Sequence, residues 1–546
     1  MADSVPQVNT HTTPASQAAD DHAKDICVIG TGPAGLAALK VIVDHPAYKA
    51  GLWHPTAYEA REDVGGIWLP ATREADPPLT PVYDSLTTII PHPAMAYASY
   101  PFPPETPLYP PASTVAKYLK DYASHFQLYP HIQFNARVQS VKWLADKKRW
   151  EVKAGGDPDS PSAAEFVTKE FDLVIVANGQ YRKPRYPSTP GLSAWREAGH
   201  VTHSAYFRNA SHPYITKSRT ILVVGGGPSG RDITAAALSL PDKVVIHSSS
   251  GATNEDLDGG RYKLRPRIKE FLPYDEVHGG SVVFEDGTTE SGITHCMIAT
   301  GYETSYPFLE PGSSDNPPLV VGIPPAIPPF PPKVYNSTYH VFPLAKLLFP
   351  LTSSPEYPPS SLAFLGIPFR VVPNLSKPGT SVDSFNFRVV PFPMAEVQTR
   401  VILKVFENPS SLDIEKEKEF MISQYKRIRA SIPPTYPYDI DTAMARLWHV
   451  LDEDEQFDYR DELHAFVGGE YAKPEWKVPK WIREVYVHKV PLRVEWKELE
   501  KTGEAQEWLK GVGEGKTATP DEEWYALIKR VLESAQRRRL GNLPPS

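Results

Sequence analysis

Two short apolar runs, each followed by a glycine-rich loop and a helical stretch of small residues, dominate the hydrophobic pattern of this chain. The first run is ICVI at residues 26–29, and the second is ILVV at residues 221–224. Short apolar runs of this kind are typical of strands that are buried on both faces of a parallel sheet. The pattern therefore predicts two strand–loop–helix units in one chain.

Both loops carry glycines at the spacing of a dinucleotide-binding turn, GTGPAG at 30–35 and GGGPSG at 225–230. The first glycine of such a turn permits the sharp bend, the second lets the backbone approach a pyrophosphate, and the third lets the helix pack on its strand. The N–H groups at the helix N-terminus then receive the phosphates. The expected contact residues are Gly30, Gly32, Pro33, Ala34 and Gly35 in the first loop and Gly225, Gly227, Pro228, Ser229, Gly230 and Arg231 in the second.

These units predict an α/β fold class, with two Rossmann-like, three-layer dinucleotide-binding domains, the second inserted in the first. The chain after about residue 411 predicts a mainly helical C-terminal extension, with helical apolar spacing at 412–429, 442–451 and 521–539. Proline-dense segments at 101–111, 316–332 and 349–359 predict ordered, extended loops, because proline interrupts helices and central strands.

The residues after each glycine loop suggest which dinucleotide it holds. A Rossmann unit carries an acid at the end of its second strand to bind ribose hydroxyls, and Glu59 fits that position. The corresponding strand at 244–250 has no acid, which favours NADP(H) because an acid would repel the 2′-phosphate. Basic residues that follow could bind that phosphate or could equally form a solvated loop. They are Arg261, Lys263, Arg265 and Arg267.

The composition favours a soluble, cytoplasmic enzyme. The chain has 546 residues and a net charge of −8, which suggests several domains and predicts neither nucleic-acid nor membrane-surface binding. Its two cysteines, Cys27 and Cys296, lie in apolar strand patterns and predict buried thiols. The absence of a CxxC pair excludes dithiol–disulfide chemistry, and no apolar stretch is long enough to predict a transmembrane helix.

Segments around the glycine loops resemble motifs of the flavin-containing monooxygenase family (class B flavoprotein monooxygenases). The resemblance runs from about residue 25 to about residue 400. It includes GGIW at 65–68, SLTT at 85–88, NARV at 135–138, VANG at 176–179, MIATGY at 297–302 and EVQ at 396–398. It implies FAD and NADPH as cofactors. Besides the loop residues and Glu59, it assigns to cofactor binding Gly66, Ile67, Trp68, Thr88, Ile89, Val138, Ala177, Asn178, Gly179, Tyr206, Ala299, Thr300, Gly301 and Gln398.

The chain departs from the family pattern at two places. The segment EAGHVTHSAYF at 197–207 resembles the identifying motif of the family, but Glu197 replaces its first aromatic residue. We interpret His203 in this segment either as a catalytic group or as a linker histidine that holds two domains in register. The second departure is Ile89, at a position where family members often carry an asparagine close to the flavin and nicotinamide. Thr88 or the amide of Gln398 could supply the missing polar contact.

The resemblance implies an oxygenase in which NADPH reduces FAD and a flavin hydroperoxide then oxygenates a soft nucleophile, a sulfide, thiol or amine. Thr88, Ile89 and Gln398 are the residues expected nearest to this reaction. Two alternatives stay open: Baeyer–Villiger oxygenation of a ketone, and an uncoupled NADPH oxidase that releases hydrogen peroxide. The expected partners are a small-molecule nucleophile and dioxygen, with no nucleic acid and no membrane, and the protein could form a homo-oligomer.

The same resemblance suggests a domain plan. Residues 1–24 are expected to form a disordered tail. Residues 25–205 and 345–546 are expected to form the two parts of the FAD-binding domain, the second with the helical extension. Residues 206–344 are expected to form the NADPH-binding domain.

Overall fold

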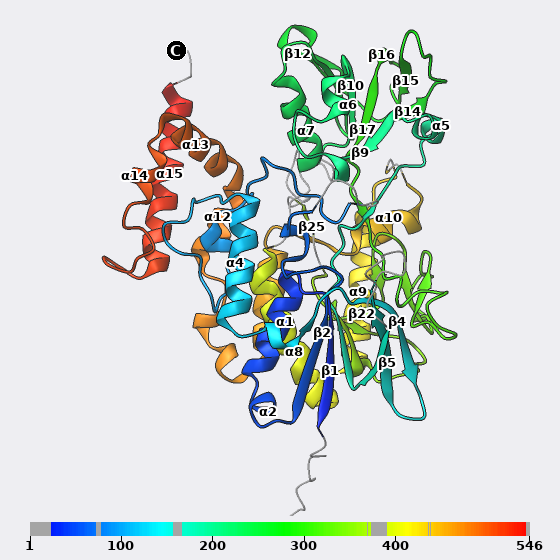
Figure 1. Ribbon diagram of the computed structural model, residues 1–546, viewed down its shortest axis with the longest axis vertical. Helices are drawn as coiled ribbons and strands as arrows, with labels where there is room; N and C mark the ends of the chain where they lie inside the picture. Colours follow the sequence, from blue (N-terminus) through cyan, green and yellow to red (C-terminus); the bar gives the residue numbers. More distant parts are fainter. Residues whose placement is uncertain are drawn as a thin grey trace, which may run out of the picture.

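Two separate parallel sheets organise the computed structural model of this chain (Figure 1). In Figure 1 the first sheet lies at the bottom, the second at the top, and the last helices of the chain stand at the left. The predicted α/β architecture with two Rossmann-like units and a helical C-terminal region is confirmed. The structure describes residues 23–71, 78–156, 166–367, 370–372, 390–434, 436 and 438–541.

The first sheet has five parallel strands in the order β24-β7-β1-β2-β3. Alternate residues of its central strand β1 face two different cores: Ile26 and Val28 lie on one side, and Cys27 and Ile29 on the other. This two-sided burial explains why the run at 26–29 is apolar throughout. The strands are β1 (Lys24–Ile29), β2 (Trp53–Tyr58), β3 (Ile132–Gln133), β7 (Leu173–Val176) and β24 (Leu362–Phe364).

Helices cover one face of this sheet and an antiparallel sheet covers the other. The helices α1 (Pro33–Asp44), α4 (Ala112–His125) and α8 (Pro391–Glu407) contribute to the first core. The antiparallel strands β4 (Arg137–Leu144), β5 (Arg149–Gly155) and β6 (Val167–Phe171) contribute to the second. The result is the predicted three-layer arrangement.

The second sheet has six strands in the order β12-β13-β11-β10-β17-β9, all parallel except β12. Helix α7 (Pro228–Leu238) packs on one face of β10, and the small sheet β14–β16 packs on the other. The strands are β9 (Val201–His203), β10 (Thr220–Val224), β11 (Val244–Ser248), β12 (Glu255–Leu257), β13 (Tyr262–Arg265), β14 (Ile268–Phe271), β15 (Gly280–Phe284), β16 (Thr289–Ile293) and β17 (His295–Ile298).

The chain leaves the first sheet after β7 and rejoins it at β24, which pairs with β7. The second unit is therefore inserted within the first, although the exact boundaries at 205 and 344 stay predictions. Strand β1 begins at Lys24, and residues 1–22 of the expected tail lie outside the described residues. Both cysteines are buried and free, as expected for core thiols.

The C-terminal region contains seven helices in the part of the chain that the structure describes. They are α9 (Ile414–Ser431), α10 (Ile440–Leu447), α11 (Glu455–Val467), α12 (Lys480–Val487), α13 (Lys489–Thr502), α14 (Ala505–Leu509) and α15 (Pro520–Gly541). The expected helix at 442–451 is confirmed up to Leu447, the end of α10, but its last residues are wrong, because residues 450–452 form strand β26 (Val450–Asp452). No helix among the described residues is long and apolar enough to cross a bilayer.

The proline-dense segments are less uniformly loop-like than predicted. Within 316–332, strand β19 (Leu319–Val321) pairs with β20 (Val334–Asn336). Within 349–359, β23 (Phe349–Pro350) pairs with β22 (Leu344–Ala345). These strands are two or three residues long and lie in small sheets, where proline removes few backbone hydrogen bonds.

Candidate functional site

The first glycine loop is shaped by close backbone contacts that only glycine permits. Gly30 has a φ of +96°, and a Cβ added there would lie 2.8 Å from the carbonyl oxygen of Ala177 at the end of β7. A Cβ at Gly35 would overlap the carbonyl oxygen of Gly30. These two glycines therefore allow α1 to pack directly against the loop and the loop to pack against the end of β7.

A second glycine pair lies against this loop. Gly65 donates its N–H to the Thr31 carbonyl oxygen at 3.1 Å, and a Cβ on Gly66 would lie 2.8 Å from the Cα of Gly32. Gly66 has a φ of +56° and opens the short 3₁₀ helix η1 (Gly66–Trp68). The structure thus brings the GGIW segment onto the glycine loop. The sequence predicts that the backbone at Gly32 approaches a pyrophosphate. In the structure, a Cβ added to Gly32 would lie 3.4 Å from the Cα of Gly66, so Gly66 covers this side of Gly32.

The open end of α1 fits a phosphate group. Gly32 is the N-cap and supplies no side-chain hydrogen bond. The first-turn N–H groups of a helix have no intrahelical partner and carry partial positive charge. The start of α1 can therefore receive a phosphate, and its assignment to the FAD pyrophosphate stays a prediction.

Glu59 is buried at the end of β2 and braces the first loop. Its Oε2 accepts the backbone N–H of Thr31 at 2.8 Å and the Thr31 hydroxyl at 2.9 Å, and its Oε1 accepts the backbone N–H of Arg61 at 3.0 Å. A contact between Glu59 and a ribose stays a prediction. Sequence reasoning missed Arg61, whose buried guanidinium donates to the carbonyl oxygens of Gly66 and Leu69 at 3.2 and 2.8 Å.

The second glycine loop repeats the same steric plan. Gly225 has a φ of +123°, and an added Cβ would overlap the carbonyl oxygen of Ala299 after β17, while a Cβ at Gly230 would overlap the Gly225 carbonyl oxygen. Gly227 caps α7 without a side-chain bond, and no atom lies within 4 Å of its would-be Cβ. The backbone at Gly227 is therefore open to approach, as a pyrophosphate site requires.

The basic run after the second loop is committed to ion pairs. Arg265 contacts Asp256 at 2.7 Å and Glu290 at 2.5 Å, and Lys263 contacts Glu290 at 2.9 Å. Arg261 pairs with Asp258 at 3.0 Å and Arg267 with Glu285 at 3.7 Å. These four residues therefore give little support to a 2′-phosphate clamp. Arg231, in the first turn of α7, is exposed.

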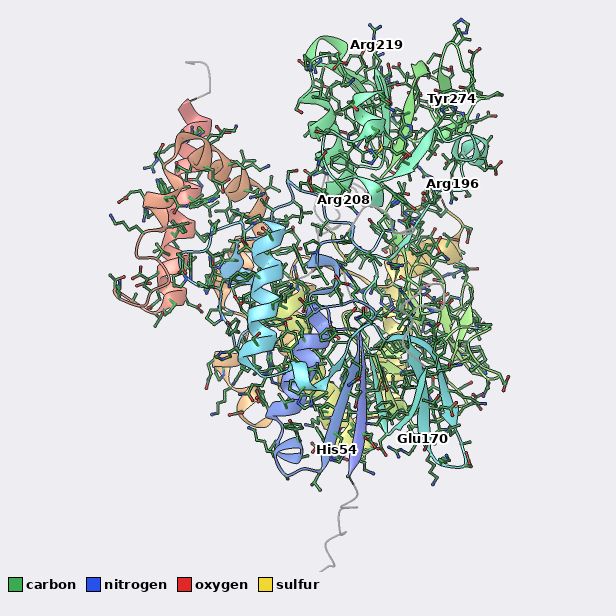
Figure 2. The ribbon with its side chains drawn as sticks, viewed as in Figure 1. His54, Glu170, Arg196, Arg208, Arg219 and Tyr274 are labelled. Atoms are coloured by element: carbon green, nitrogen blue, oxygen red, sulfur yellow. The ribbon has the colours of Figure 1, made fainter. Side chains whose placement is uncertain are left out.

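A strap of residues 78–111 connects the two loops. Thr80 donates its hydroxyl to the carbonyl oxygen of Ile67 beside the first loop, and Tyr83 donates its hydroxyl to Asp232 of α7. Arg208 donates to the Thr80 carbonyl oxygen at 3.0 Å, and Figure 2 shows it at the lower end of the second unit. Neither Arg208 nor Asp232 is among the site residues that the sequence predicted. Both residues hold the strap.

His203 is buried at the end of β9 and fixed by two backbone groups. Its Nδ1 accepts the N–H of Ala205 at 3.1 Å, so the ring proton is on Nε2, which donates to the Gly301 carbonyl oxygen at 3.0 Å. Burial lowers the pKa of His203 to about 4, so it is neutral near pH 7. This geometry favours the linker interpretation, because neither ring nitrogen is left to exchange a proton. Tyr206 ends the short 3₁₀ helix that follows, η3 (Ser204–Tyr206).

The three residues expected nearest to the reaction have different environments. The hydroxyl oxygen of Thr88 is buried and has no hydrogen-bond partner within the described residues. Ile89 is 38 % exposed. Gln398, on α8, accepts the N–H of Gly366 at 3.2 Å and donates to the hydroxyl of Tyr459 at 3.1 Å. The amide of Gln398 therefore already has partners, and Thr88 is the better source of the missing polar contact.

The remaining predicted residues lie at the ends of sheet strands. Val138 is buried in β4, and Gly179 follows β7 with a φ of +73°. Asn178 donates its side-chain N–H to the Ser305 carbonyl oxygen at 3.2 Å. Thr300 follows β17 and donates its hydroxyl to the Arg185 carbonyl oxygen at 2.6 Å. The structure thus places Ala177, Asn178 and Gly179 after β7, and Ala299, Thr300 and Gly301 after β17.

Known proteins are similar to this chain in sequence. Residues 23–257 match the family described as flavin-binding monooxygenase-like. Over this segment, which is somewhat less than half of its length, the chain is similar to that family. It is 28 % identical over 491 residues to flavin-containing monooxygenase FMO GS-OX-like 7 of Arabidopsis thaliana, covering 84 % of this chain and 86 % of the plant protein. It is 29 % identical over 293 residues to the thiol-specific monooxygenase of Saccharomyces cerevisiae, covering 53 % of this chain and 62 % of the yeast protein.

The fold of this chain is also similar to a solved structure. The S-allyl-L-cysteine S-oxygenase of Allium sativum superposes with a TM-score of 0.63 at 22 % identity, covering 94 % of this chain and 99 % of that one. The C-terminal helices that the sequence pattern only partly predicted are therefore included in a known overall fold.

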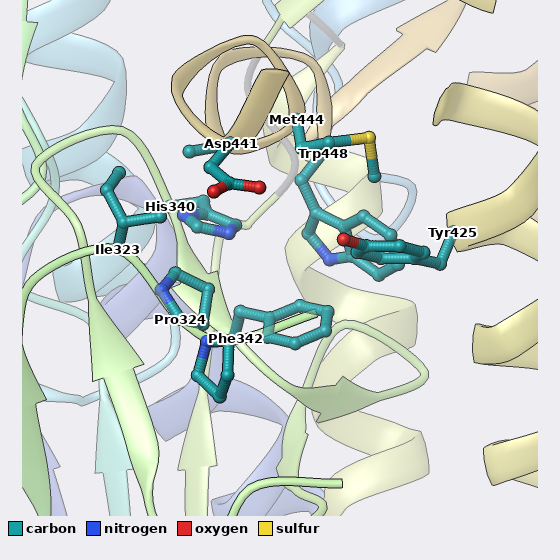
Figure 3. A pocket seen from close by; sticks show the side chains of 10 residues that line it. Ile323, Pro324, His340, Phe342, Tyr425, Asp441, Met444 and Trp448 are labelled. Atoms are coloured by element: carbon teal, nitrogen blue, oxygen red, sulfur yellow. The ribbon is translucent and has the colours of Figure 1, made fainter. Parts of the chain in front are cut away.

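One pocket of the protein lies apart from the predicted site (Figure 3). It lies between the proline-rich segment and helices α9 and α10. Its ten lining residues include none of the predicted site residues, and Figure 3 shows the rings of Phe342, Tyr425 and Trp448 on one side of it. These rings contact one another, with the Phe342 and Trp448 centroids 4.8 Å apart. The pocket is therefore a packing junction rather than part of the candidate site.

Buried neutral histidines should make this protein sensitive to acid. Burial lowers the pKa of His203 to about 4, below the ordinary 6.5, so between these values the unfolded chain binds a proton that the folded chain does not. The free energy of unfolding therefore falls as the pH drops through this window, by about 1.4 kcal/mol per pH unit for each such histidine, and changes little above it. Urea unfolding measures the free energy of unfolding at about pH 7 and at about pH 5. The decrease between these two pH values should be smaller for His203→Gln than for wild type. An unchanged pH dependence in His203→Gln would contradict the buried, neutral state of this ring.

Proposed function

We propose that this protein is an FAD- and NADPH-dependent monooxygenase that transfers one oxygen atom of O₂ to soft nucleophiles, namely sulfides, thiols or amines. The observation that carries the proposal is the pair of glycine loops. Each loop packs closely against a carbonyl group at the end of a strand, the first against Ala177 and the second against Ala299. Two dinucleotide cradles of the same steric plan, in a chain similar to a family that uses FAD and NADPH, would hold two dinucleotides in one protein, and these cofactors would supply the redox chemistry.

The roles of the chain's own residues follow from their positions. The cofactors supply the redox chemistry when bound, and the protein orients them and excludes water. In this proposal α1 and Gly65–Trp68 hold the FAD pyrophosphate, and α7 with Gly227 holds that of NADPH. The buried hydroxyl of Thr88 offers a hydrogen bond near the reacting groups. Residues 25–205 and 345–546 then form the FAD-binding part and 206–344 the NADPH-binding part.

Sulfur is the preferred reacting atom in this proposal. The yeast relative is named as a thiol-specific monooxygenase, and its alignment covers about half of this chain. A sulfide or thiol is also a soft nucleophile that needs no activation by a side-chain base. This requirement agrees with a site in which His203 has both ring nitrogens engaged.

The test is a product balance under air with the purified, flavin-loaded protein. Methyl phenyl sulfide, a tertiary amine and cyclohexanone are offered separately, each with NADPH and with NADH. We expect sulfoxide or N-oxide close to one per NADPH consumed, with NADH much the poorer reductant. Ester from the ketone would instead indicate a Baeyer–Villiger oxygenase, and peroxide without any oxygenated product would contradict the proposal.

The peroxide-releasing alternative is favoured by one observation, the apolar and 38 % exposed side chain at Ile89. If an amide at this position steadies the bound cofactors, Ile89→Asn should lower the peroxide released per NADPH and raise the yield of sulfoxide. The exposed position means that the new amide can be solvated, so the fold should tolerate it. Peroxide and sulfoxide are measured for both proteins, with Ile89→Val as the size control. Equal peroxide yields would show that Ile89 does not influence coupling.

A further inference from the structure

The C-terminal extension reaches the candidate site through one cation, Arg493 of α13. Its guanidinium donates an N–H to the hydroxyl of Thr87, next to Thr88 in the strap. The guanidinium carbon also lies 4.5 Å from the centre of the Tyr109 ring, which forms a platform under it. These contacts hold a half-buried arginine against the segment that carries Thr88 and Ile89.

The charge of Arg493 is not neutralised by a carboxylate in the described part of the chain. The acids that act on it electrostatically, Glu500 and Asp232, do so without a hydrogen bond or an ion pair. Other arginines of the same region are paired: Arg483 with Asp461 at 2.7 Å and Arg538 with Glu495 at 3.0 Å. A guanidinium has five N–H donors in a planar fork that matches an oxyanion. In Arg493 one of these N–H groups donates to Thr87. The Tyr109 ring contacts the face of the guanidinium and accepts none of the N–H groups in its plane.

Arg493 lies where three elements of the site meet. Thr87 belongs to the strap, and the same strap joins Asp232 of α7 through Tyr83. Asp232 follows the second glycine loop by two residues. On α13 itself, Val490 lies three residues before Arg493, on the same side of the helix, and is 46 % exposed. A cation on the same helix face as an exposed apolar side chain suits a small molecule that carries both an anionic and an apolar end.

We propose that Arg493 binds an oxyanion of a molecule that enters this site, either a carboxylate of the substrate or a phosphate of the dinucleotide. The choice of sulfides as substrates rests on the proposed function, whereas the binding of an oxyanion by Arg493 does not depend on it. A partly desolvated guanidinium gains most from a bidentate oxyanion, which restores the interactions that burial removes. If the oxyanion is a carboxylate of the substrate, Arg493 favours anionic sulfides over neutral ones.

The test compares two substrates of the same shape, 3-(methylthio)propanoate and its amide. Arg493→Met should raise the KM for the acid by roughly 10- to 100-fold, the range for a lost charge-assisted hydrogen bond, and leave the KM for the amide unchanged. Lys497→Met, at an exposed lysine one turn further along the same helix, is the control for a lost charge. Binding without turnover is measured by calorimetry with NADP⁺, and by thermal shift with the acid and the amide.

The outcomes separate the two sources of the oxyanion. A loss specific to the acid identifies the substrate carboxylate, whereas an equal loss of NADP⁺ affinity with both substrates identifies the dinucleotide phosphate. Unchanged binding of both the acid and NADP⁺ would overturn the proposal. If Arg493→Met does not fold, Arg493→Lys keeps the charge without the fork and should give a smaller loss for the same ligand. If wild type oxygenates nothing, the proposed function fails, while the binding measurements still decide the role of Arg493.

Discussion

Gly35→Ala is expected to remove bound flavin and to destabilise the first unit by about 3 kcal/mol or more, the upper range for overpacking a core. The new Cβ would overlap the carbonyl oxygen of Gly30, and a backbone atom of the loop cannot move aside as a flexible side chain could. Either α1 must leave the loop or the loop must leave β7. Flavin absorbance per protein and urea unfolding measure the two effects.

Gly32→Ala is the matched control in the same loop. Its Cβ would lie 3.4 Å from the Cα of Gly66, close to ordinary contact, and the φ of Gly32 is −67°. The protein should therefore still fold. The segment Gly65–Trp68, which packs on Gly32, should shift, and flavin should be retained poorly. A Gly35→Ala protein with a full flavin spectrum and the wild-type unfolding midpoint would refute the steric account of this loop.

The strands and glycine loops could be predicted because local sequence determines them. A run such as 26–29 is apolar throughout since its strand faces a core on each side. The glycines at 30, 35, 225 and 230 are required by backbone contacts within their own units. Such requirements depend on residue type and spacing, which the sequence displays directly.

Contacts between residues far apart in the chain could not be predicted. The basic run after β11 looked available for a phosphate, but Glu290 from β16 neutralises Lys263 and Arg265. Arg493 contacts Thr87, which is 406 residues away in sequence. No spacing rule links such positions, because the fold alone brings them together.

Buried charges also concealed part of the helical extension. On α13, Lys489 and Glu495 are both almost fully buried. Lys489 pairs with Glu453 at 2.6 Å, and Glu495 pairs with Arg538 at 3.0 Å. Charged residues on the buried face interrupt the apolar spacing by which an amphipathic helix is recognised. For this reason the pattern predicted α9 and α15 but not α13.

Gly227→Ala is expected to weaken the binding of NADPH strongly while leaving flavin and fold intact. The φ of Gly227 is −72°, which any residue adopts, and no atom lies within 4 Å of the added Cβ. The methyl group therefore costs the folded protein little. It occupies the space through which the backbone of α7 approaches a pyrophosphate, so the N–H groups of the first turn lose their charge-assisted hydrogen bonds.

The loss of affinity for NADP⁺ should be roughly 10- to 100-fold, as expected for one charge-assisted hydrogen bond, and more if several are lost. Calorimetry with NADP⁺ measures this loss, and chemical reduction of the flavin by dithionite checks that the first site still works. Gly230→Ala is the contrasting variant, because its Cβ would overlap the Gly225 carbonyl oxygen and disrupt the second unit itself. If Gly227→Ala binds NADP⁺ as tightly as wild type, the second glycine loop does not hold the dinucleotide, and the two-cradle basis of the proposed function fails with it.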